Sequence, residues 1–205
     1  MYERFIKRGL DVVISLVSLV ALSPLFLLIA IAIKLDSKGP VIFRQKRYGQ
    51  HKELFDICKF RTMRTETPRD VPTNDLRGAK SYITRVGKIL RMTSLDELPQ
   101  LWNILVGDMS LIGPRPALWN QYDLMEWRDK FGASDIRPGL SGWAQVNGRD
   151  YLSRDLEKKA RRDGEYAHNI SFAFDLKCFL LTIVKVFNRQ GIVEGAEETK
   201  TEGKR

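Results

Sequence analysis

The chain has 205 residues, of which 43% are hydrophobic and 29% are charged, so it can form one globular domain with an appendage. This composition excludes fibrous, low-complexity and disordered proteins. Two cysteines, Cys58 and Cys178, are too few and too far apart for a disulfide framework or a zinc knuckle, which favours a reducing compartment. The net charge of +9 predicts an anionic partner, and nucleic acid, anionic lipid and a phosphorylated substrate all qualify.

The first predicted element is the apolar segment 12–33, whose 22 residues carry no charge. This length exceeds the roughly 18 apolar residues that indicate a membrane helix. It also exceeds the apolar core of about 7–15 residues that is typical of a cleaved signal peptide. We therefore expect the segment to be retained and to meet a bilayer.

Two features bear on whether this segment crosses the membrane. Ser23 and Pro24 lie at its middle, where a proline removes a backbone hydrogen bond and predicts a sharp kink. Basic residues flank both ends, and the positive-inside rule then places both ends on the cytoplasmic side. A helix that bends at Ser23 and Pro24 and returns to the same face satisfies both observations, whereas an ordinary kinked spanning helix is the alternative. The flanking basic residues are Arg4, Lys7, Arg8, Lys34, Lys38, Arg44, Lys46 and Arg47.

Residues 40–61 predict a β-hairpin, because two β-prone runs flank the turn Tyr48-Gly49-Gln50. The segment 34–64 contains nine basic residues and three acidic ones. This excess indicates attraction to an anionic bilayer, at about 1 kcal/mol for each basic residue close to its surface. Residues 65–79 are rich in Pro, Asp, Asn and Thr and predict a loop.

Helices are expected in the remainder of the chain. The segment 117–131 mixes aromatic and charged residues and suits either a core-facing or a membrane-interface helix, of which the core position is preferred. The segment 172–188 is very apolar but too short and too charged to span a bilayer, so we expect a core or interfacial helix. The predicted helices lie near 83–92, 97–106, 117–131, 152–167 and 172–188.

Several common catalytic signatures are missing from the sequence. It contains no glycine-rich Walker or dinucleotide loop, no His-Glu-x-x-His, and no Asp-x-Asp of the kind that holds metal and nucleotide in many glycosyltransferases. The two histidines, His51 and His168, occur in contexts typical of a surface or loop, which disfavours a Ser-His-Asp system. Carboxylates are therefore the candidate catalytic groups.

Asp96 and Glu97 precede the apolar run 101–105 at the predicted start of a helix. One interpretation is structural, because Ser94 and Glu97 match a capping box and acidic residues suit the positive end of a helix dipole. The other is catalytic, because a helix N-terminus keeps a carboxylate ionised and Asp96 could then attack phosphorus to form an acyl phosphate. Two adjacent carboxylates repel each other unless a cation accompanies them, which points to Mg²⁺ with Asp96 and Glu97 as ligands.

Basic residues in rigid settings occur on both sides of this pair in the sequence. Pro114 and Pro116 flank Arg115 and fix its backbone, which suits bidentate recognition of phosphate. A single residue of this kind is as often a solvated surface charge, whereas several in loops framed by Pro and Gly favour an anion site. The candidate anion-binding residues are Lys59, Arg61, Arg91, Arg115, Arg137 and Arg149.

Four long motifs, taken in order, resemble the bacterial sugar transferase family, whose members are the monotopic phosphoglycosyl transferases. The resemblance runs from about residue 3 to residue 190, and the chain resembles the minimal form without the additional membrane helices of larger relatives. The motifs are KFRTM at 59–63, SLDELPQLWN at 94–103, GDMSLIGPRP at 107–116 and RPGLSGWAQVNGR at 137–149.

The resemblance implies transfer of a sugar 1-phosphate from a UDP-sugar to undecaprenyl phosphate, with release of UMP, as the first membrane step of a bacterial surface glycan. It implies that Asp96 is the nucleophile, that Glu97 is its catalytic companion and that Mg²⁺ is required. It also implies a re-entrant helix broken at a Ser-Pro pair, here Ser23 and Pro24, on the cytoplasmic side of the inner membrane. The sugar stays open.

Within this mechanism we expect Lys59, Arg91 and Arg115 near the phosphates and Arg149 near the nucleotide. Asp163 is a further candidate for substrate binding, and it aligns with an acidic position of the family, as does Asp175. The segment around Asp163 matches the family pattern less well than the other motifs do.

We therefore predict an α+β, mainly helical fold with a small β-hairpin and interfacial amphipathic helices. Residues 1–36 would form the re-entrant membrane helix, 37–190 the cytoplasmic catalytic domain and 191–205 a disordered tail. The expected partners are a UDP-sugar, undecaprenyl phosphate and the inner leaflet, and a homodimer would suit a membrane-bound enzyme of this size.

Two alternatives remain. The first is a membrane-anchored glycosyltransferase without a covalent step, which the missing Asp-x-Asp disfavours. The second is a basic membrane-surface adaptor in which Asp96 and Glu97 only cap a helix. Nucleic acid is a poor candidate partner, because the chain has basic residues but no recognisable binding module.

Overall fold

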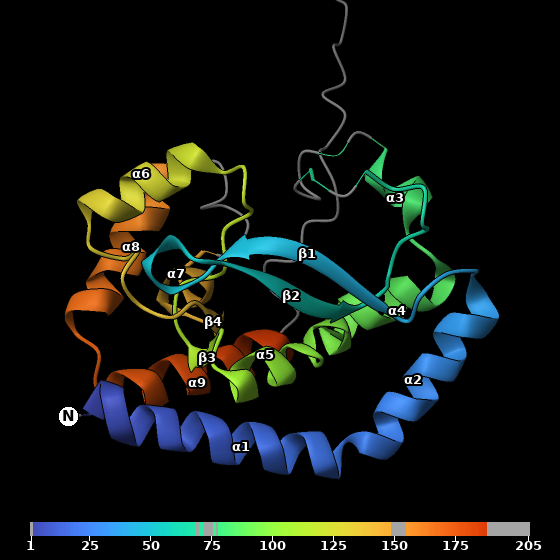
Figure 1. Ribbon diagram of the computed structural model, residues 1–205, viewed down its shortest axis with the longest axis horizontal. Coiled ribbons are helices and arrows are strands. Elements are labelled where there is room, and N and C mark those ends of the chain that lie inside the picture. Colours follow the sequence, from blue (N-terminus) through green and yellow to red (C-terminus); the bar gives the residue numbers. More distant parts are fainter. Residues whose placement is uncertain (1, 69, 72–75, 77, 149–154, 188–205) are drawn as a thin grey trace, which may run out of the picture.

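The computed structural model describes the chain except for residues 1, 69, 72–75, 77, 149–154 and 188–205 (Figure 1). The fold is α+β and mainly helical, with a small antiparallel hairpin, as predicted. In chain order its elements are a π-helical turn Tyr2–Lys7, α1 Arg8–Ala21, α2 Ser23–Asp36, β1 Ile42–Tyr48, a 3-10 turn Gln50–Lys52, β2 Leu54–Phe60, α3 Ala79–Tyr82, α4 Arg85–Thr93, the 3-10 turn η3 Leu95–Glu97, α5 Gln100–Val106, β3 Ser110–Ile112, α6 Tyr122–Lys130, β4 Gly139–Ser141, α7 Trp143–Val146, α8 Leu156–His168 and α9 Phe172–Phe187. The expected disorder of 191–205 concerns residues outside the described part, and the predicted loop 65–79 is described only in part.

The apolar N-terminal segment folds as two helices, α1 and α2, that meet at a bend of 61° (Figure 1). Pro24 occupies the first turn of α2, where its missing N–H costs nothing, and the Ser23 hydroxyl donates a hydrogen bond of 2.8 Å to the Val20 carbonyl. The predicted kink at Ser23 and Pro24 is confirmed. No single helix among the described residues is long and apolar enough to cross a membrane, whereas this bent pair is, by length and composition.

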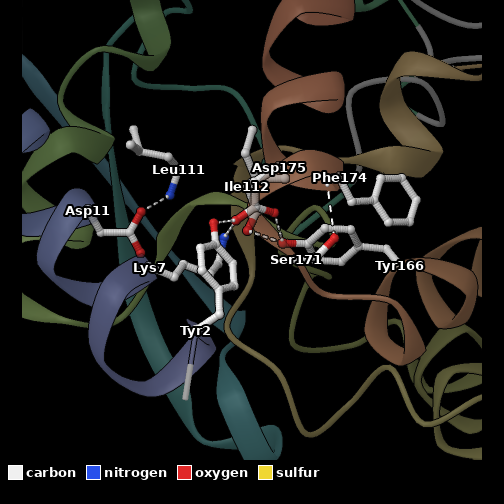
Figure 2. Close-up of polar contacts among 9 residues, drawn as sticks. All are labelled: Tyr2, Lys7, Asp11, Leu111, Ile112, Tyr166, Ser171, Phe174 and Asp175. Atoms are coloured by element: carbon white, nitrogen blue, oxygen red, sulfur yellow. Dashed lines mark hydrogen bonds and ion pairs between the residues drawn. The ribbon is translucent and has the colours of Figure 1, made fainter.

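A buried polar network attaches the start of α1 to the rest of the fold (Figure 2). One oxygen of Asp175 accepts hydrogen bonds from Lys7 Nζ at 2.6 Å and from the Tyr2 hydroxyl at 2.7 Å, and the other accepts from the Tyr166 hydroxyl. The carboxylate of Asp11 accepts a backbone N–H of β3 at 2.9 Å. Lys7, Asp11 and Asp175 are all buried, and buried charges are stable only when they are paired. The network therefore holds α1 against α9 and β3.

Arg8 makes a second attachment, at the end of α5. Its guanidinium donates to the carbonyls of Ile104 at 2.6 Å and Leu105 at 2.9 Å, which lie in the last turn of that helix. A cation at this position satisfies orphan carbonyls and suits the negative end of the helix dipole. Lys7 and Arg8, which the charge pattern treated as flanking membrane charges, thus have defined partners within the protein.

The predicted hairpin is confirmed, since β1 and β2 pair antiparallel from Ile42 opposite Phe60 to Tyr48 opposite Leu54. Phe60 packs against α2 and α4 in one buried cluster, which also contains Ile33 and Leu90. A second cluster joins β2 to α5. This packing holds β2 over the segment that carries Asp96 and Glu97.

The structure contains a second sheet that the sequence did not predict. Strands β3 and β4 pair in parallel, with Ser110 opposite Gly139 and Ile112 opposite Ser141. A Cβ on Gly139 would lie 2.1 Å from the backbone nitrogen of Gly113, so the two backbones can approach only because Gly139 has no side chain. The strands have three residues each, too few for a periodic signal, and their pairing joins motifs that are far apart in the sequence.

The predicted helices are present with shifted boundaries, and residues 152–154 and 188 of the predicted ranges lie outside the described part of the chain. Helix α6 begins at Tyr122 rather than near residue 117, and α5 begins at Gln100 rather than 97. In the α6 region Leu118 and Met125 are buried, which confirms the core interpretation, and Figure 1 shows α6 across the hairpin from α1. Helix α9 buries Asp175 and Cys178 and leaves a row of apolar side chains exposed. It is therefore amphipathic, as expected.

The network around Asp175 predicts a large effect of a small substitution. Asp175→Asn preserves the shape of the side chain but leaves the Lys7 ammonium buried without a counter-ion. We expect a loss of about 3–5 kcal/mol in the free energy of unfolding, which denaturant titration of the detergent-held protein would measure.

A double-mutant cycle supplies the control. Lys7→Met combined with Asp175→Asn should lose less than the sum of the two single losses, because the double variant has no unpaired buried charge. Additive losses would show that the two side chains do not stabilise each other.

Candidate active site

Asp96 and Glu97 lie in the 3-10 turn η3, which follows α4 and precedes α5. Ser94 adopts a left-handed backbone conformation with φ of 57°, and its side chain caps neither η3 nor α5. The predicted capping box is therefore wrong. The physical reason is that the carboxylate of Glu97 turns toward two cations, each of which binds it more strongly than a neutral backbone N–H would.

Glu97 is the centre of a partly buried ion triplet. Its Oε1 accepts hydrogen bonds from Lys59 Nζ at 2.8 Å and from Arg115 Nη2 at 2.9 Å. The side chain of Glu97 is 13% exposed and that of Lys59 is 16% exposed. Burial alone would raise the pKa of Glu97, but Arg115 and Lys59 outweigh it and hold that pKa well below its usual value. Glu97 is thus ionised and fixed in place.

Asp96 has the opposite electrostatic character. Among the described residues, no group donates a hydrogen bond to its carboxylate. Burial raises its pKa, and the negative charge of Glu97 adds to this, while Lys59, Arg91 and Arg115 oppose the shift. Adjacent carboxylates whose environments push their pKa values apart are typical of catalytic sites. The unpartnered oxygens of Asp96 are the ones available to a substrate.

The structure brings three of the predicted anion-binding residues to this pair. Lys59 reaches Glu97 from β2 and Arg115 reaches it from the loop after β3, while Arg91, in the last turn of α4, is close enough for its charge to lower the pKa of Asp96. Three cations therefore face two carboxylates, and the excess positive charge suits an anionic substrate.

Other predicted site residues lie elsewhere. Arg61 is buried, and its guanidinium donates hydrogen bonds to the Pro40 carbonyl and to the hydroxyl and carbonyl of Ser37. These bonds connect the end of α2 to the end of β2. Arg137 donates to the Gly107 carbonyl at 3.1 Å and lines a small cavity beside Lys7 rather than the carboxylate pair. Arg149 is outside the described residues.

Asp163 lies in α8 and is connected to the site through Arg128. It is buried and accepts two hydrogen bonds from Arg128, at 2.7 and 2.9 Å, and Arg128 in turn donates to the backbone carbonyl of Arg115 at 2.9 Å. Asp163 therefore positions Arg128, and Arg128 in turn holds the loop of Arg115. Among the described residues, Asp163 makes no hydrogen bond or ion pair with Asp96 or Glu97.

Two arginines that the sequence analysis did not predict as site residues hold the loop of Arg115. Arg128 contacts the carbonyl of Arg115, and Arg47 Nη1 donates to the carbonyl of Pro116 at 3.2 Å. Arg128 lies in α6, which contains none of the four family motifs. Arg47 lies in the basic segment 34–64, which predicted attraction to an anionic bilayer. Only the tertiary contacts distinguish them from surface charges.

Mg²⁺ can be tested against the residues present. The described part of the chain contains no group of three or more His, Cys, Asp or Glu that could hold a metal by itself. Mg²⁺ usually binds through one or two carboxylates together with substrate phosphates and water. Asp96 and Glu97 fit such a shared site, in which Asp96 has oxygens available.

The opposite pKa shifts predict opposite effects on stability. A carboxyl whose pKa is raised on folding destabilises the fold wherever it is ionised, so Asp96→Asn should raise the thermal midpoint at pH 7. A carboxyl whose pKa is lowered stabilises the fold above its usual pKa of 4.5, so Glu97→Gln should lower the midpoint at pH 7. Calorimetry of the metal-free protein at pH 7 checks both signs.

The effect of Glu97→Gln should fade as the pH falls below 4.5 toward the depressed folded pKa, because wild-type Glu97 then loses its own contribution. A midpoint that falls for Asp96→Asn at pH 7 would contradict the assigned roles of the two carboxylates.

Comparison with known proteins matches the chain to the family described as bacterial sugar transferase over residues 2–189. The UDP-glucose:undecaprenyl-phosphate glucose-1-phosphate transferase of Escherichia coli (strain K12) is 43% identical over 200 residues, covering 90% of this chain and 41% of that protein. The "Uncharacterized sugar transferase EpsL" of Bacillus subtilis (strain 168) is 40% identical over 187 residues, covering 91% of this chain and 90% of that protein.

A third relative, the UDP-N-acetylgalactosamine-undecaprenyl-phosphate N-acetylgalactosaminephosphotransferase of Aeromonas hydrophila, is 40% identical over 182 residues. The chain spans only 41% and 43% of the length of the Escherichia coli and Aeromonas proteins. The family match nevertheless includes the apolar helix pair, the hairpin and the carboxylate pair with its cations. The chain therefore belongs to the bacterial sugar transferase family.

Proposed function

We propose that this protein transfers a sugar 1-phosphate from a UDP-sugar to undecaprenyl phosphate and releases UMP. The observation that carries the proposal is the contrast between Glu97, held ionised by Lys59 and Arg115, and Asp96, whose oxygens have no hydrogen-bond donor among the described residues. Relatives named for glucose and for N-acetylgalactosamine share undecaprenyl phosphate in their names, which supports the acceptor and leaves the sugar open.

The reaction would proceed in two displacements at phosphorus. A carboxylate oxygen of Asp96 attacks the sugar-linked phosphorus of the donor, the bond from that phosphorus to the bridging oxygen breaks, and the oxygen leaves on UMP with the electron pair. An oxygen of the lipid phosphate then attacks the same phosphorus and releases the Asp96 carboxylate. Neither step requires a proton, which agrees with a site that is rich in cations.

The chain's cations would supply the electrostatic part of catalysis. Glu97 holds Lys59 and Arg115 side by side, and Arg91 on α4 is close enough for its charge to act on Asp96. Charge that develops on the phosphate oxygens would meet donors already in position, which is usually the largest contribution in phosphoryl transfer. Mg²⁺, held by Asp96 and Glu97 together with the donor phosphates, would neutralise further charge on the diphosphate.

The exposed apolar side chains support a location at a membrane. They cover α1 and α2 and continue on α5 and α9, and a contiguous exposed apolar surface of this kind marks a membrane or protein contact. We propose that the bent pair enters the inner leaflet and returns to the cytoplasmic side, with α5 and α9 at the interface. Examples with more than half of the side chain exposed are Val13, Val17, Val20, Leu27, Leu28, Leu35, Trp102, Val106, Phe172, Leu180 and Val184.

The alternative of a membrane-surface adaptor has lost its structural support. It required Glu97 to serve as part of a helix cap, and Glu97 instead binds Lys59 and Arg115. A helix cap would need neither the raised pKa of Asp96 nor three cations around the pair.

Release of UMP tests the reaction. The detergent-held protein, mixed with Mg²⁺, undecaprenyl phosphate and single UDP-sugars, should release UMP with one or a few of them. Asp96→Asn should reduce this release by at least about 10⁴-fold, because the nucleophile is lost. Release of UDP instead of UMP, or normal turnover by Asp96→Asn, would contradict the mechanism, and chelation of Mg²⁺ should also abolish turnover.

Membrane topology is tested by thiol labelling. Single cysteines introduced at Glu3 and Lys38 should both react with a membrane-impermeant maleimide from the cytoplasmic side of inverted vesicles. The native Cys58 and Cys178 are buried, which keeps the background low. Labelling of the two introduced cysteines from opposite sides would show a spanning helix instead.

A further inference from the structure

A group of cations continues from the active site toward α8. Arg47 comes from β1, Arg115 from the loop after β3, Arg128 from α6 and Lys159 from α8. Arg128 and Arg47 both hydrogen-bond the loop of Arg115, through the carbonyls of Arg115 and Pro116. The charges of all three arginines act on Lys159. Four separate elements thus bring positive charge to one place, which costs free energy unless an anion offsets it.

The partners within the protein do not offset this charge. Asp163 neutralises Arg128, and Glu97 is shared between Arg115 and Lys59. The side-chain ammonium of Lys159 donates no hydrogen bond to any described residue, and the buried Nε of Arg47 has no acceptor among them either, although the other two nitrogens of that guanidinium bond Pro116 and Gln45. Two cationic donors are therefore left without an acceptor beside an arginine of the active site.

We propose that Arg47 and Lys159 form an anion subsite for the phosphate that stays on the nucleoside, next to the reacting phosphate at Asp96. This inference rests on the proposed function. Arg115 connects the two positions, because it bonds Glu97 while its charge also acts on Arg47 and Lys159. A diphosphate has two adjacent phosphates and so matches two adjacent groups of cations that share Arg115.

The subsite has a defined part in the reaction. When the bond to the bridging oxygen breaks, that oxygen gains negative charge and stays on the nucleoside monophosphate. Arg47 and Lys159 would bind the departing phosphate as its charge increases, which stabilises the transition state more than the bound donor.

The position of the subsite favours the soluble donor over the lipid phosphate. Figure 1 shows α6 and the adjoining part of α8 on the side of the hairpin that faces away from α1. The exposed apolar surface lies on α1, α2, α5 and α9, at which a polyprenyl phosphate would arrive.

Nucleotide binding tests the subsite separately from turnover. UMP binding is measured by calorimetry with the full-length, detergent-held Asp96→Asn protein, which cannot react. Adding Lys159→Gln should weaken UMP binding by at least about tenfold and leave uridine binding unchanged, because only UMP has the phosphate. Lys158→Gln is the matched control, since it removes the same charge from an exposed neighbour on α8.

Thermal unfolding distinguishes this role from a structural one. The ammonium of Lys159 makes no hydrogen bond to a described residue, and the charges of three arginines act on it against that of Asp163, so Lys159→Gln should not lower the thermal midpoint of the nucleotide-free protein. A lowered midpoint, or equal UMP affinity in Lys159→Gln and its parent, would overturn the proposal. An increase in the KM for undecaprenyl phosphate without a change in UMP binding would also overturn it, in favour of the lipid phosphate.

The pH dependence of binding gives a further readout. Burial, followed by the charges of Arg128, Arg115 and Arg47, lowers the pKa of Lys159 to about 8, while Asp163 opposes this shift. UMP should therefore bind less tightly as the pH rises from about 7 to about 9, since the ammonium loses its charge. Lys159→Arg should remove this decline, because a guanidinium stays protonated, and an identical decline in both proteins would contradict the assignment.

The failure of this inference differs from the failure of the proposed function. If UMP binding depends on Lys159 but no UDP-sugar releases UMP, the subsite stands and the reaction is wrong. If UMP is released normally and binding is indifferent to Lys159, the reaction stands and the subsite is wrong.

Discussion

The attachment of an apolar helix pair to a polar domain depends on the buried carboxylate of Asp175. Helices α1 and α2 have few polar groups, so their hydrogen bonds to the rest of the fold lie at the start of α1 and at the end of α2. At the start of α1, Asp175 binds Lys7, Tyr2 and Tyr166. A network of this kind is directional, and it therefore sets the orientation of α1, which apolar packing alone would leave free to slide or rotate.

The same contacts lead to the candidate active site through β3. Asp11 binds a backbone N–H of this strand, and the Tyr166 hydroxyl binds the carbonyl of Ile112 at its end. Gly113 follows this strand and packs against Gly139. Two residues later, Arg115 donates a hydrogen bond to Glu97. The position of the bent helix pair and the position of Arg115 in the candidate active site are thus set by one short strand. This arrangement suits chemistry between a soluble donor and an acceptor in the membrane.

Within the site, neighbouring carboxylates have divided roles. Glu97 is paired twice, is held ionised and orders Lys59 and Arg115. Asp96 is left without a donor among the described residues, and its raised pKa means that its burial destabilises the fold. A group retained at the expense of stability is typical of functional sites, where reactivity depends on incomplete satisfaction of polar groups. The Nε of Arg47 and the ammonium of Lys159 have the same character, because neither has a hydrogen-bond acceptor among the described residues.

Local signals in the sequence determined the bend at Pro24, the hairpin, most helices and the Asp96 and Glu97 pair with Lys59, Arg91 and Arg115. Proline geometry, β-propensity and residue spacing act over a few residues, so they can be read without the fold. The tertiary structure alone decided the β3–β4 pairing, the burial of Lys7, the replacement of the capping box, and the distant roles of Arg61 and Asp163. These features depend on groups far apart in the chain, and a charge has the same sequence signature whether it contacts solvent, a backbone carbonyl or a substrate.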